Sequence, residues 1–382
     1  MTDHGSERLT VLMSPDYSDS NPYQSELIDA LEAHDVRVFP VDVSGVFPLL
    51  SGVRRHGVPD VVHLHWIHRF LIAERWGRPL FAVLLAIRLF VELVFLKALG
   101  VRLVWTVHNL ANHERHAVRT ELASSHVVAR LVDQIVVHCE SAVGTVCDCY
   151  RLPEHVGERI RVVPHGHFDN AYRDEITQTE ARRRLDLPQD DPVLLYFGLI
   201  RSYKNVLELV ETFRTVEGDA RLLIVGNPWD ETIENRVCRA CESDERVEAV
   251  FEYVSDEEVQ VYMGAADAIV LPYDSILTSG SAVLGMSFGR AVVAPQLGCL
   301  PDMVGSDGGI LYDPSDPDGL RSGLVRAVND PEALAAMGRR NRAVARQLDW
   351  DRIGKRIRTL YLEDSTLDVG DDMQPASGMT SA

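Results

Sequence analysis

One segment, residues 268–294, constrains the fold of this chain more than any other part of the sequence. Its pattern predicts a buried strand, a polar loop, a helix closed by Gly289 and a second buried strand, over residues 268–271, 274–280, 281–288 and 291–294. This order is a βαβ unit, so the chain is expected to contain an open α/β sheet. Ligands of such sheets bind at the carboxyl ends of the strands, where the polar loop lies.

The polar loop offers groups that bind an anion. Thr278, Ser279, Gly280 and Ser281 bring hydroxyls and backbone N–H groups to a helix N-terminus, which suits a diphosphate. A serine N-cap on an ordinary crossover helix would show the same residues. The loop alone therefore leaves both interpretations open.

A second loop carries two cations at the end of another predicted strand. Residues 192–197 form that strand, Gly198 ends it, and Arg201 and Lys204 precede a helix that begins near Asn205. Arginine can form two parallel hydrogen bonds with a phosphate, and lysine adds a mobile charge. A solvated basic turn is the alternative.

Two further predicted strands end in small or polar residues. Residues 221–225 lead into Gly226 and Asn227, and residues 250–254 lead into a helix cap at Ser255. Several such strand ends on one edge of a sheet describe a crevice for a nucleotide.

The N-terminal half shows its own alternation of strands and helices. Strands are predicted over residues 9–13, 37–41, 61–64, 102–107, 134–137 and 160–163, with a helix over 23–33. Alternation at this rhythm implies a second, mostly parallel, doubly wound sheet. A chain of 382 residues, 46% of them hydrophobic, is long enough for two such cores.

Histidines stand at the ends of four of these strands. They are His65, His108, His138 and His165, and the residues that follow three of them are Trp66, Asn109 and Gly166. Imidazole can act as a base or donate to developing phosphate charge, although each histidine taken alone is more simply a hydrogen-bonded structural group. His63 should face the other side of its strand, and a zinc site lacks the usual ligand spacing. Glu114 is the acidic candidate near His108 for deprotonating an acceptor hydroxyl, with a solvated surface carboxylate as its alternative.

These loops together resemble those of the GT-B glycosyltransferases, and of glycosyltransferase family 4 in particular. The segment from Gly198 to Lys204 resembles the family's basic loop, and the segment from Ser279 to Gly289 resembles the helix that covers the donor sugar and phosphates. Residues 253–258 and 265–273 resemble the elements between them. The resemblance runs over nearly the full length. It implies an α/β fold of the GT-B type, in which two Rossmann-like, doubly wound parallel-sheet domains face a central cleft.

The resemblance also implies roles for individual residues. The donor diphosphate would be held by Arg201, Lys204, Gly198, Thr278, Ser279, Gly280 and Ser281, and the nucleotide and sugar pocket would include Gly226, Asn227, Tyr253 and Tyr273. His108, with Glu114 or His65, would act at the reacting centre, and Trp66, Asn109, His138, His165 and Gly166 would line the interdomain and acceptor side. The chain departs from family 4 in one respect. Ile276 and Leu284 stand where two glutamates usually contact the sugar and the ribose, so neither those contacts nor a retaining mechanism carry over.

The predicted domain plan follows the same resemblance. Residues 1–170 are predicted to be the acceptor-side domain and residues 171–349 the donor domain. Residues 350–363 resemble the GT-B helix that crosses back to the first domain. Residues 364–382, rich in Asp, Gly, Ser and Pro, are predicted to be a disordered acidic tail.

Charge and cysteine content bound the partners and the compartment. A net charge of −19 and a pI near 5.1 argue against nucleic acid as a ligand. The chain has few lysines, and its acidity resembles that of halophile cytosolic proteins or reflects a GC-rich coding bias. Scattered cysteines without a signal peptide indicate a reducing cytosol. No metal or other cofactor is required, because helix dipoles and the Arg201 and Lys204 cations can neutralise a leaving diphosphate.

Residues 79–99 form an apolar stretch long enough to span a bilayer. Arg88, Glu92 and Lys97 interrupt it, and it lies between two predicted sheet strands, so spanning would break the domain. Arg88 and Glu92 are four residues apart and share one polar stripe. We expect a buried or interface-lying helix, with peripheral contact at the inner face of the cell membrane.

The sequence therefore predicts a cytoplasmic glycosyltransferase of the hexosyltransferase type. It would move a sugar from a nucleoside diphosphate sugar to a hydroxyl of a glycan or lipid-linked acceptor, in the synthesis of a cell-surface polysaccharide or a glycoprotein glycan. A GT-B nucleotide-sugar epimerase would use the same crevice without an acceptor. A non-catalytic nucleotide-sugar-binding subunit of a glycan-assembly complex would explain the missing glutamates. The fold alone does not choose the sugar, the base or the acceptor.

Overall fold

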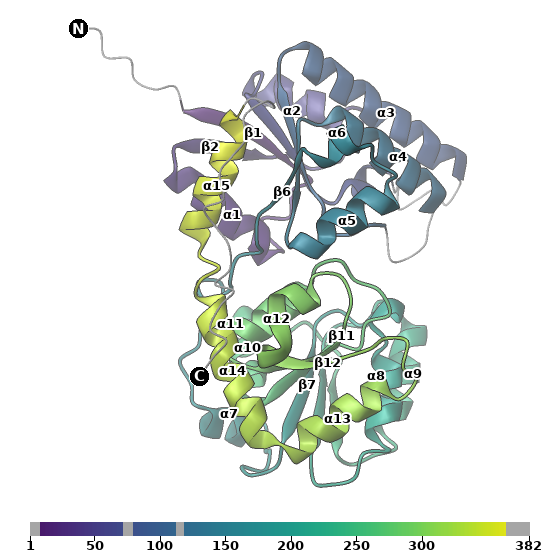
Figure 1. Cartoon of the computed structure of the whole chain (residues 1–382), viewed down its shortest axis with the longest axis vertical. Coiled ribbons are helices and arrows are strands. Elements are labelled where there is room, and N and C mark those ends of the chain that lie inside the picture. The colour runs from purple at the N-terminus through teal and green to yellow at the C-terminus, as the bar shows by residue number, and fades with distance from the viewer. Residues whose placement is uncertain (1–7, 72–78, 112–117, 364–382) are drawn as a thin grey trace, which may run out of the picture.

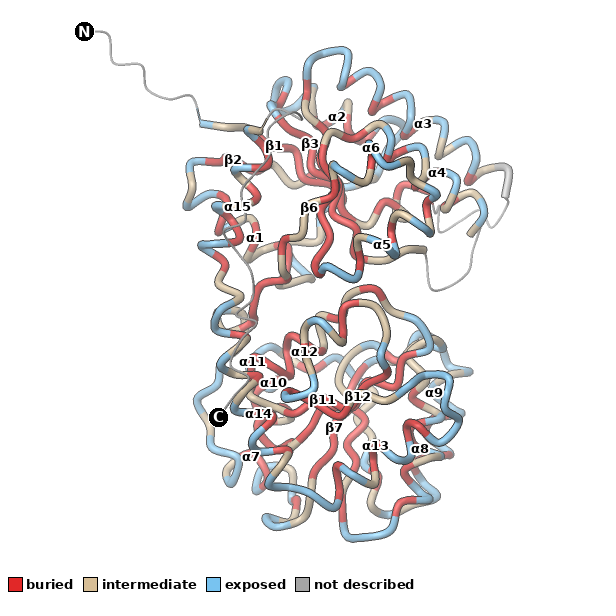
Figure 2. Tube along the Cα trace, in the orientation of Figure 1, coloured by how far each residue is buried: buried red, intermediate tan, exposed pale blue. Residues whose placement is uncertain are grey.

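The computed structural model describes residues 8–71, 79–111 and 118–363. Over these residues the chain forms two lobes, each built on a six-stranded parallel sheet with helices on both faces (Figure 1). Buried residues gather along the strands of both sheets (Figure 2), because helices cover each sheet from two sides. The predicted α/β fold with two doubly wound sheets is confirmed.

The N-terminal lobe has the strand order β2-β1-β3-β4-β5-β6. Its strands are β1 (Leu9–Ser14), β2 (Val36–Pro40), β3 (Val61–Leu64), β4 (Arg102–Thr106), β5 (Gln134–Val137) and β6 (Ile160–Val162). Its helices are α1 (Pro22–Ala33), α2 (Pro48–His56), α3 (Pro79–Ala98), α4 (Val118–Leu131), α5 (Glu140–Cys149) and α6 (Glu154–Gly157). Strand β3 is buried along its whole length, as expected for a central strand of a parallel sheet.

The C-terminal lobe has the strand order β12-β11-β10-β7-β8-β9. Its strands are β7 (Val193–Phe197), β8 (Arg221–Val225), β9 (Val247–Val250), β10 (Ala268–Val270), β11 (Ala291–Pro295) and β12 (Gly309–Tyr312). Its helices are α7 (Gln178–Arg184), α8 (Val206–Phe213), α9 (Glu231–Cys241), α10 (Asp256–Ala265), α11 (Gly280–Ser287), α12 (Leu300–Gly308), α13 (Gly319–Asn329) and α14 (Pro331–Ala345). The unit β10-α11-β11 is the βαβ segment that the sequence predicted.

Two strands differ from the sequence prediction. The strand expected over residues 250–254 is β9, which lies earlier, because Val247 and Val250 pair with Leu222 and Val225 of β8. Strand β12 was not predicted, since it begins at Gly309, and glycine normally indicates a turn.

The chain returns to the N-terminal lobe after α14. Helix α15 (Trp350–Leu362) packs along α1, where it is the yellow helix in Figure 1. Its buried face is formed by Trp350, Ile353, Ile357, Leu360 and Tyr361, which join the core around Val11 and Leu27. Gly354 permits the close approach, because a Cβ there would lie 2.7 Å from the Ala30 carbonyl oxygen. A segment from the end of the chain thus completes the first lobe.

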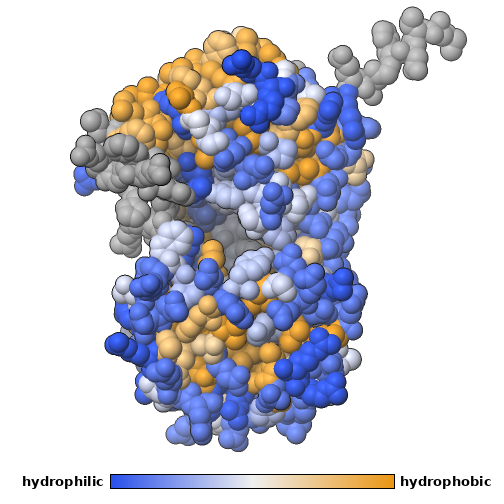
Figure 3. Space-filling model, turned by 180° about the vertical axis from the view of Figure 1, so that it is seen from behind, coloured by the Kyte–Doolittle hydropathy of each residue, from blue (hydrophilic) through white to orange (hydrophobic). Residues whose placement is uncertain are grey.

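Helix α3 turns Arg88 and Glu92 inward and several of its apolar residues outward. Glu92 is buried and accepts a hydrogen bond from Leu50 N, while Arg88 donates to the carbonyl oxygens of Gly45 and Phe70. Apolar side chains of α3 that are at least 41% exposed are Val83, Leu84, Ile87, Phe90, Val91, Val94 and Phe95. Apolar residues also gather at the top of the surface in Figure 3, at the α3 end of the molecule. Within the described part of the chain, no helix combines the length and hydrophobicity needed to cross a membrane.

Candidate functional site

The carboxyl edges of the two sheets face each other, and the surface is hollowed between the lobes (Figure 3). Ser141, at the start of α5, joins the two sides. Its backbone N–H donates to Asp302 Oδ2 at 2.9 Å, and its hydroxyl donates to the Gly298 carbonyl oxygen at 3.1 Å. The predicted residues of the two lobes therefore lie on opposite sides of one cleft between the lobes.

The polar loop before α11 is organised around Ser279. Its side chain caps the helix by accepting from Ala282 N at 3.2 Å, and it lies 3.2 Å from the Tyr273 hydroxyl. Thr278 Oγ1 lies 3.6 Å from Cys299 Sγ, so the loop also contacts the turn before α12. The capping interpretation of Ser279 is correct, and the cap leaves the backbone N–H groups of the first turn available to an anion.

Lys204 lies beside this loop. Its ammonium is 5.8 Å from the centre of the Tyr273 ring. A Cβ on Gly198 would lie 3.5 Å from Lys204 Nζ and 3.3 Å from Ser281 Oγ, so the two strand ends meet. Burial, and then the nearby Arg201 charge, lower the pKa of Lys204 to about 8. A bound anion would stabilise the charged form of Lys204 and would offset both causes of the lowered pKa.

Arg201 is the second cation of this region. Its guanidinium is 4.3 Å from the centre of the Trp229 ring, in the geometry of a cation–π contact. It is also one of the charges that act on Lys204. Arg201, Lys204 and Ser279 therefore face one region rather than separate surfaces, as the sequence interpretation required.

The glycines predicted in this region have a steric reason. Gly226 has φ +150°, and a Cβ there would lie 1.9 Å from the Gly198 carbonyl oxygen, so the two loops touch through their backbones. Asn227 accepts a hydrogen bond from Ile200 N at 2.9 Å. Tyr253 is 79% exposed, and its side chain interacts with Asp256. The structure thus brings Gly226 and Asn227 to the cleft loops, and the predicted role of Tyr253 stays a prediction.

Three of the four histidines at the strand ends, His65, His108 and His138, form one hydrogen-bonded histidine chain. His138 Nδ1 lies 2.9 Å from the Val163 carbonyl oxygen, His138 Nε2 lies 3.3 Å from His108 Nδ1, and His108 Nε2 lies 3.0 Å from His65 Nδ1. A carbonyl only accepts, so His138 Nδ1 carries the proton, and each following ring must donate through its own Nδ1. His65 Nε2 is then a buried lone pair, and among the described residues it has no hydrogen-bond partner.

Burial keeps these rings neutral. It lowers the pKa of His138 to about 4 and the pKa values of His65 and His108 well below the usual range, and neighbouring histidines add to the effect on His65 and His108. Both ring nitrogens of His108 are already hydrogen-bonded to neighbouring histidines. The bond from His65 must therefore open before His108 Nε2 can accept a proton from a hydroxyl.

Some residues that pack around these histidines were not predicted from the sequence. Tyr23 of α1 lies with its ring centre 4.9 Å from that of His108 and 5.5 Å from that of His138, although nothing in the helix pattern marks it. The prediction that His63 faces the other side of its strand is wrong, because residues two apart in a strand share a face and the ring centres of His63 and His65 are 4.2 Å apart. His63 Nδ1 and Nε2 contact the hydroxyls of Tyr361 and Thr106 at 2.6 and 2.8 Å, so the ring has a structural role.

A small pocket beside His108 is lined by two more of the predicted residues of this lobe. Trp66 stacks on His108 with ring centres 4.3 Å apart, and Asn109 lines the same pocket. Glu121, a buried carboxylate that sequence reasoning missed, lines it as well. Glu114 lies outside the described residues, so its predicted role stays a prediction.

His165 and Gly166 lie where the chain passes from one lobe to the other. A Cβ on Gly166 would lie 2.2 Å from the Trp350 ring, so only glycine fits beneath α15. His165 Nε2 would lie 3.9 Å from a Cβ on Gly280, at the first residue of α11. This histidine therefore joins the histidine chain to the polar loop, since its ring is also 5.6 Å from that of His138.

A disulfide between Cys139 and Cys299 crosses between the lobes. Cys139 follows His138, and Cys299 precedes α12 next to Thr278, so the bond lies between the two halves of the site. The expectation that all cysteines are reduced is wrong for this pair. A separation of 160 residues carries no signal of pairing, and only the approach of the two lobes brings the sulfurs together.

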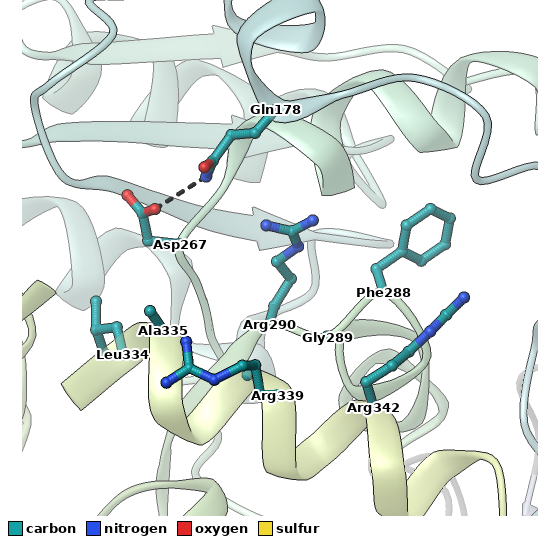
Figure 4. Close-up of a pocket in the computed structure, with 10 residues that line it drawn as sticks. Gln178, Asp267, Phe288, Gly289, Arg290, Leu334, Ala335, Arg339 and Arg342 are labelled. Carbon is teal, nitrogen blue, oxygen red and sulfur yellow. Dashed lines mark hydrogen bonds between the residues drawn. The ribbon is translucent and has the colours of Figure 1, made fainter. Parts of the chain in front are cut away.

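A pocket of about 340 Å³ lies elsewhere in the structure. It lies at the amino ends of β10 and β11, opposite the cleft, and is bordered by Arg290, Arg339 and Arg342 (Figure 4). Arg342 pairs with Asp169 at 3.1 Å and Asp174 at 3.0 Å, which ties the interlobe segment to α14. None of the predicted donor-binding residues lines this pocket, so we read it as structural.

Known proteins resemble the chain in sequence and in fold. Residues 191–330 match the family model described as Glycosyl transferases group 1. The chain is 32% identical over 364 residues to a GDP-mannose:glycolipid 4-beta-D-mannosyltransferase of Xanthomonas campestris pv. campestris, with 93% of each chain covered. It is 25% identical to a D-inositol 3-phosphate glycosyltransferase of Xylanimonas cellulosilytica, with 81% of this chain and 73% of the relative covered.

Solved structures share the fold at lower identity. Sucrose-phosphate synthase from Thermosynechococcus elongatus superposes with a TM-score of 0.73 at 18% identity, covering 93% of this chain and 98% of that one. HepE of Anabaena, solved in complex with UDP and glucose, superposes with a TM-score of 0.66 at 15% identity, covering 92% and 98%. Both superpositions extend over the two lobes.

Proposed function

The chain belongs to the GT-B glycosyltransferases of the group 1 family, and we propose that it transfers mannose from GDP-mannose to a hydroxyl of a glycolipid. The observation that carries the choice of donor and acceptor is the 32% identity to a mannosyltransferase named for both, over 93% of each chain. A product that belongs to a cell-surface polysaccharide is consistent with a glycolipid acceptor.

The diphosphate of the donor would bind between the two loops of the C-terminal lobe. The meeting of Lys204, Ser281 and Gly198, with the capped start of α11 beside them, supports this placement. A helix N-terminus and a cation together stabilise the negative charge that develops on a leaving diphosphate. In this proposal the cation and the helix N-terminus take the place of a metal ion.

The relative's name specifies a β-linkage, and mannose is α-linked in GDP-mannose. We infer a single displacement with inversion, in which the acceptor hydroxyl attacks the anomeric carbon, the bond to the diphosphate breaks, and the hydroxyl proton passes to a base. His108 with His65 is the pair that the sequence predicted for the reacting centre. The His65–His108 hydrogen bond would have to open on acceptor binding for that role.

A glycolipid acceptor would require the enzyme to reach a membrane surface. We propose that the exposed apolar side chains of α3 make this contact, with the helix lying in the interface rather than crossing it. Leu84→Asp/Phe95→Asp should reduce co-flotation with phospholipid vesicles. The control Leu362→Asp changes a side chain that is equally exposed on α15 and should float as the wild type does. Equal flotation of all three proteins would remove α3 from the proposal.

The transfer itself is tested with radiolabelled GDP-mannose and a membrane glycolipid extract. We expect label in the lipid fraction, and a β-linkage by nuclear magnetic resonance of the product. Transfer from UDP-glucose in place of GDP-mannose would overturn the proposed donor. Conversion of the donor sugar without any acceptor would instead identify an epimerase.

A further inference from the structure

His165 has a fixed tautomer. Its Nδ1 lies 2.7 Å from the Gly166 carbonyl oxygen, which can only accept. In the neutral ring the proton is therefore on Nδ1, and Nε2 carries a lone pair. The hydrogen bond goes to the next residue of the same chain segment, so movements of the lobes do not break it.

The ring cannot readily turn over. Its centre lies 4.7 Å from that of Tyr23, 5.3 Å from that of Phe168 and 5.6 Å from that of His138, and the side chain is buried. Such a packed environment holds a planar side chain in one orientation. Nε2 therefore keeps its direction toward Gly280, the first residue of α11.

This direction creates a conflict when a diphosphate binds. The N-terminus of α11 attracts negative charge, whereas a lone pair beside it repels the same charge. A protonated Nε2 would remove the conflict, because it would donate a charge-assisted hydrogen bond.

We propose that His165 takes up one proton from solvent when the donor diphosphate binds, so that Nε2–H donates a hydrogen bond to a diphosphate oxygen at the start of α11. The proton returns to solvent when the nucleoside diphosphate leaves. The inference rests on the proposed binding of a nucleoside diphosphate sugar in this cleft and adds a coupled protonation to it.

The surroundings agree with a neutral ring in the empty cleft. Burial, and then the nearby His138, lower the pKa of His165 to about 3, although the hydrogen bond to the Gly166 carbonyl oxygen acts in the opposite direction. The groups packed around it are Tyr23 from α1, His108 and His138 from the ends of β4 and β5, Phe168, Trp350 from α15 and Gly280 from α11. Among these neighbours none carries a carboxylate, so the incoming diphosphate would supply the negative charge.

Calorimetry of GDP-mannose binding at pH 7.0 tests the proposal, in two buffers with different ionisation enthalpies. GDP-mannose has no phosphate group that titrates near neutral pH, so protons taken up are taken up by the protein. Lys204, with a pKa of about 8, is already about nine-tenths protonated at this pH and adds at most about 0.1 proton. We expect the wild type to take up between about 0.5 and 1 proton per donor bound.

His165→Gln keeps a group that can donate but cannot titrate, and it should take up no more than the share of Lys204. Guanosine, which lacks phosphates, should bind the wild type without proton uptake, and this measurement does not depend on whether the variant folds. The affinity of the wild type should also fall as the pH rises from 6 to 7, where Lys204 keeps about nine-tenths of its charge.

Three results would overturn the inference. GDP-mannose binding to the wild type without proton uptake would remove the coupled protonation and leave the proposed function intact. Uptake that persists in a folded His165→Gln protein would assign the proton to another group. Absence of any binding heat for both GDP-mannose and UDP-glucose would remove the proposed function, and this inference with it.

Discussion

Removal of the Cys139–Cys299 disulfide should lower the free energy of unfolding by up to about 5 kcal/mol. The bond closes a loop of 160 residues, and the chain-entropy relation for a loop of that length gives this value at 25 °C. It is an upper limit, because residual structure in the unfolded chain reduces the entropy that the bond removes. The double variant Cys139→Ser/Cys299→Ser removes the bond without leaving a single buried thiol.

The assay is urea unfolding followed by tryptophan fluorescence, with and without dithiothreitol. The wild type should lose stability when the reductant converts the disulfide to two thiols, and the double variant should show the lower stability in both conditions. Cys147→Ser/Cys238→Ser is the matched control, because neither cysteine is in a disulfide. Its unfolding should shift with reductant as the wild type's does.

Peptide mapping under non-reducing conditions provides an independent measurement. The peptides that contain Cys139 and Cys299 should appear as one cross-linked species in protein purified without reductant. Separate peptides after mild oxidation, together with an unfolding curve that dithiothreitol does not shift, would refute the reasoning.

Further substitutions test other parts of the site. Lys204→Met should weaken donor binding, measured by calorimetry, by on the order of tenfold to a hundredfold, because the buried charge is lost. Lys355→Met, on the exposed side of α15, is the control and should bind the donor as the wild type does. The contribution of the Lys204 charge should be full below pH 8 and should disappear as the pH rises above it, so donor affinity should decline there; affinity that stays level up to pH 10 would contradict it. His108→Ala should lower turnover on the order of a hundredfold with a smaller effect on donor affinity, and a fully active variant would remove it from the mechanism. Gly166→Ala should destabilise the protein by about 1–3 kcal/mol in thermal unfolding, because its Cβ would meet Trp350, whereas Gly144→Ala meets no atom within 4 Å and should not.

The sheets were predictable because their signals are local. A short apolar run indicates the strand at 61–64, and apolar runs with a helix cap indicate the βαβ unit around Ser279. Each of these signals lies within a few residues. Gly309 led to a missed strand, because the reason for a glycine there is a contact with a distant part of the sequence. A Cβ there would lie 2.2 Å from the Val292 carbonyl oxygen, so the residue is glycine because β11 is close, not because the chain turns.

The residues of the site were partly predictable, but their connections were not. Which strand ends carry histidine can be read from the sequence, because parallel strands bring their ends to one edge. The direction of the hydrogen bonds from His138 to His65 depends on one carbonyl group, that of Val163 on the neighbouring strand end. Tyr23 and Trp350 enter the same cluster from helices at opposite ends of the chain, and no pattern in the sequence relates them.

The return of α15 to the first lobe decides how this enzyme can be divided in the laboratory. A fragment that stops near residue 170 would lack Trp350, Ile357 and Tyr361 and would present the bare flank of α1 to water. Such a fragment should aggregate rather than report on acceptor recognition. Chimeras that exchange the acceptor half between related enzymes should therefore carry both pieces, the first 170 residues and the closing helix, from the same parent.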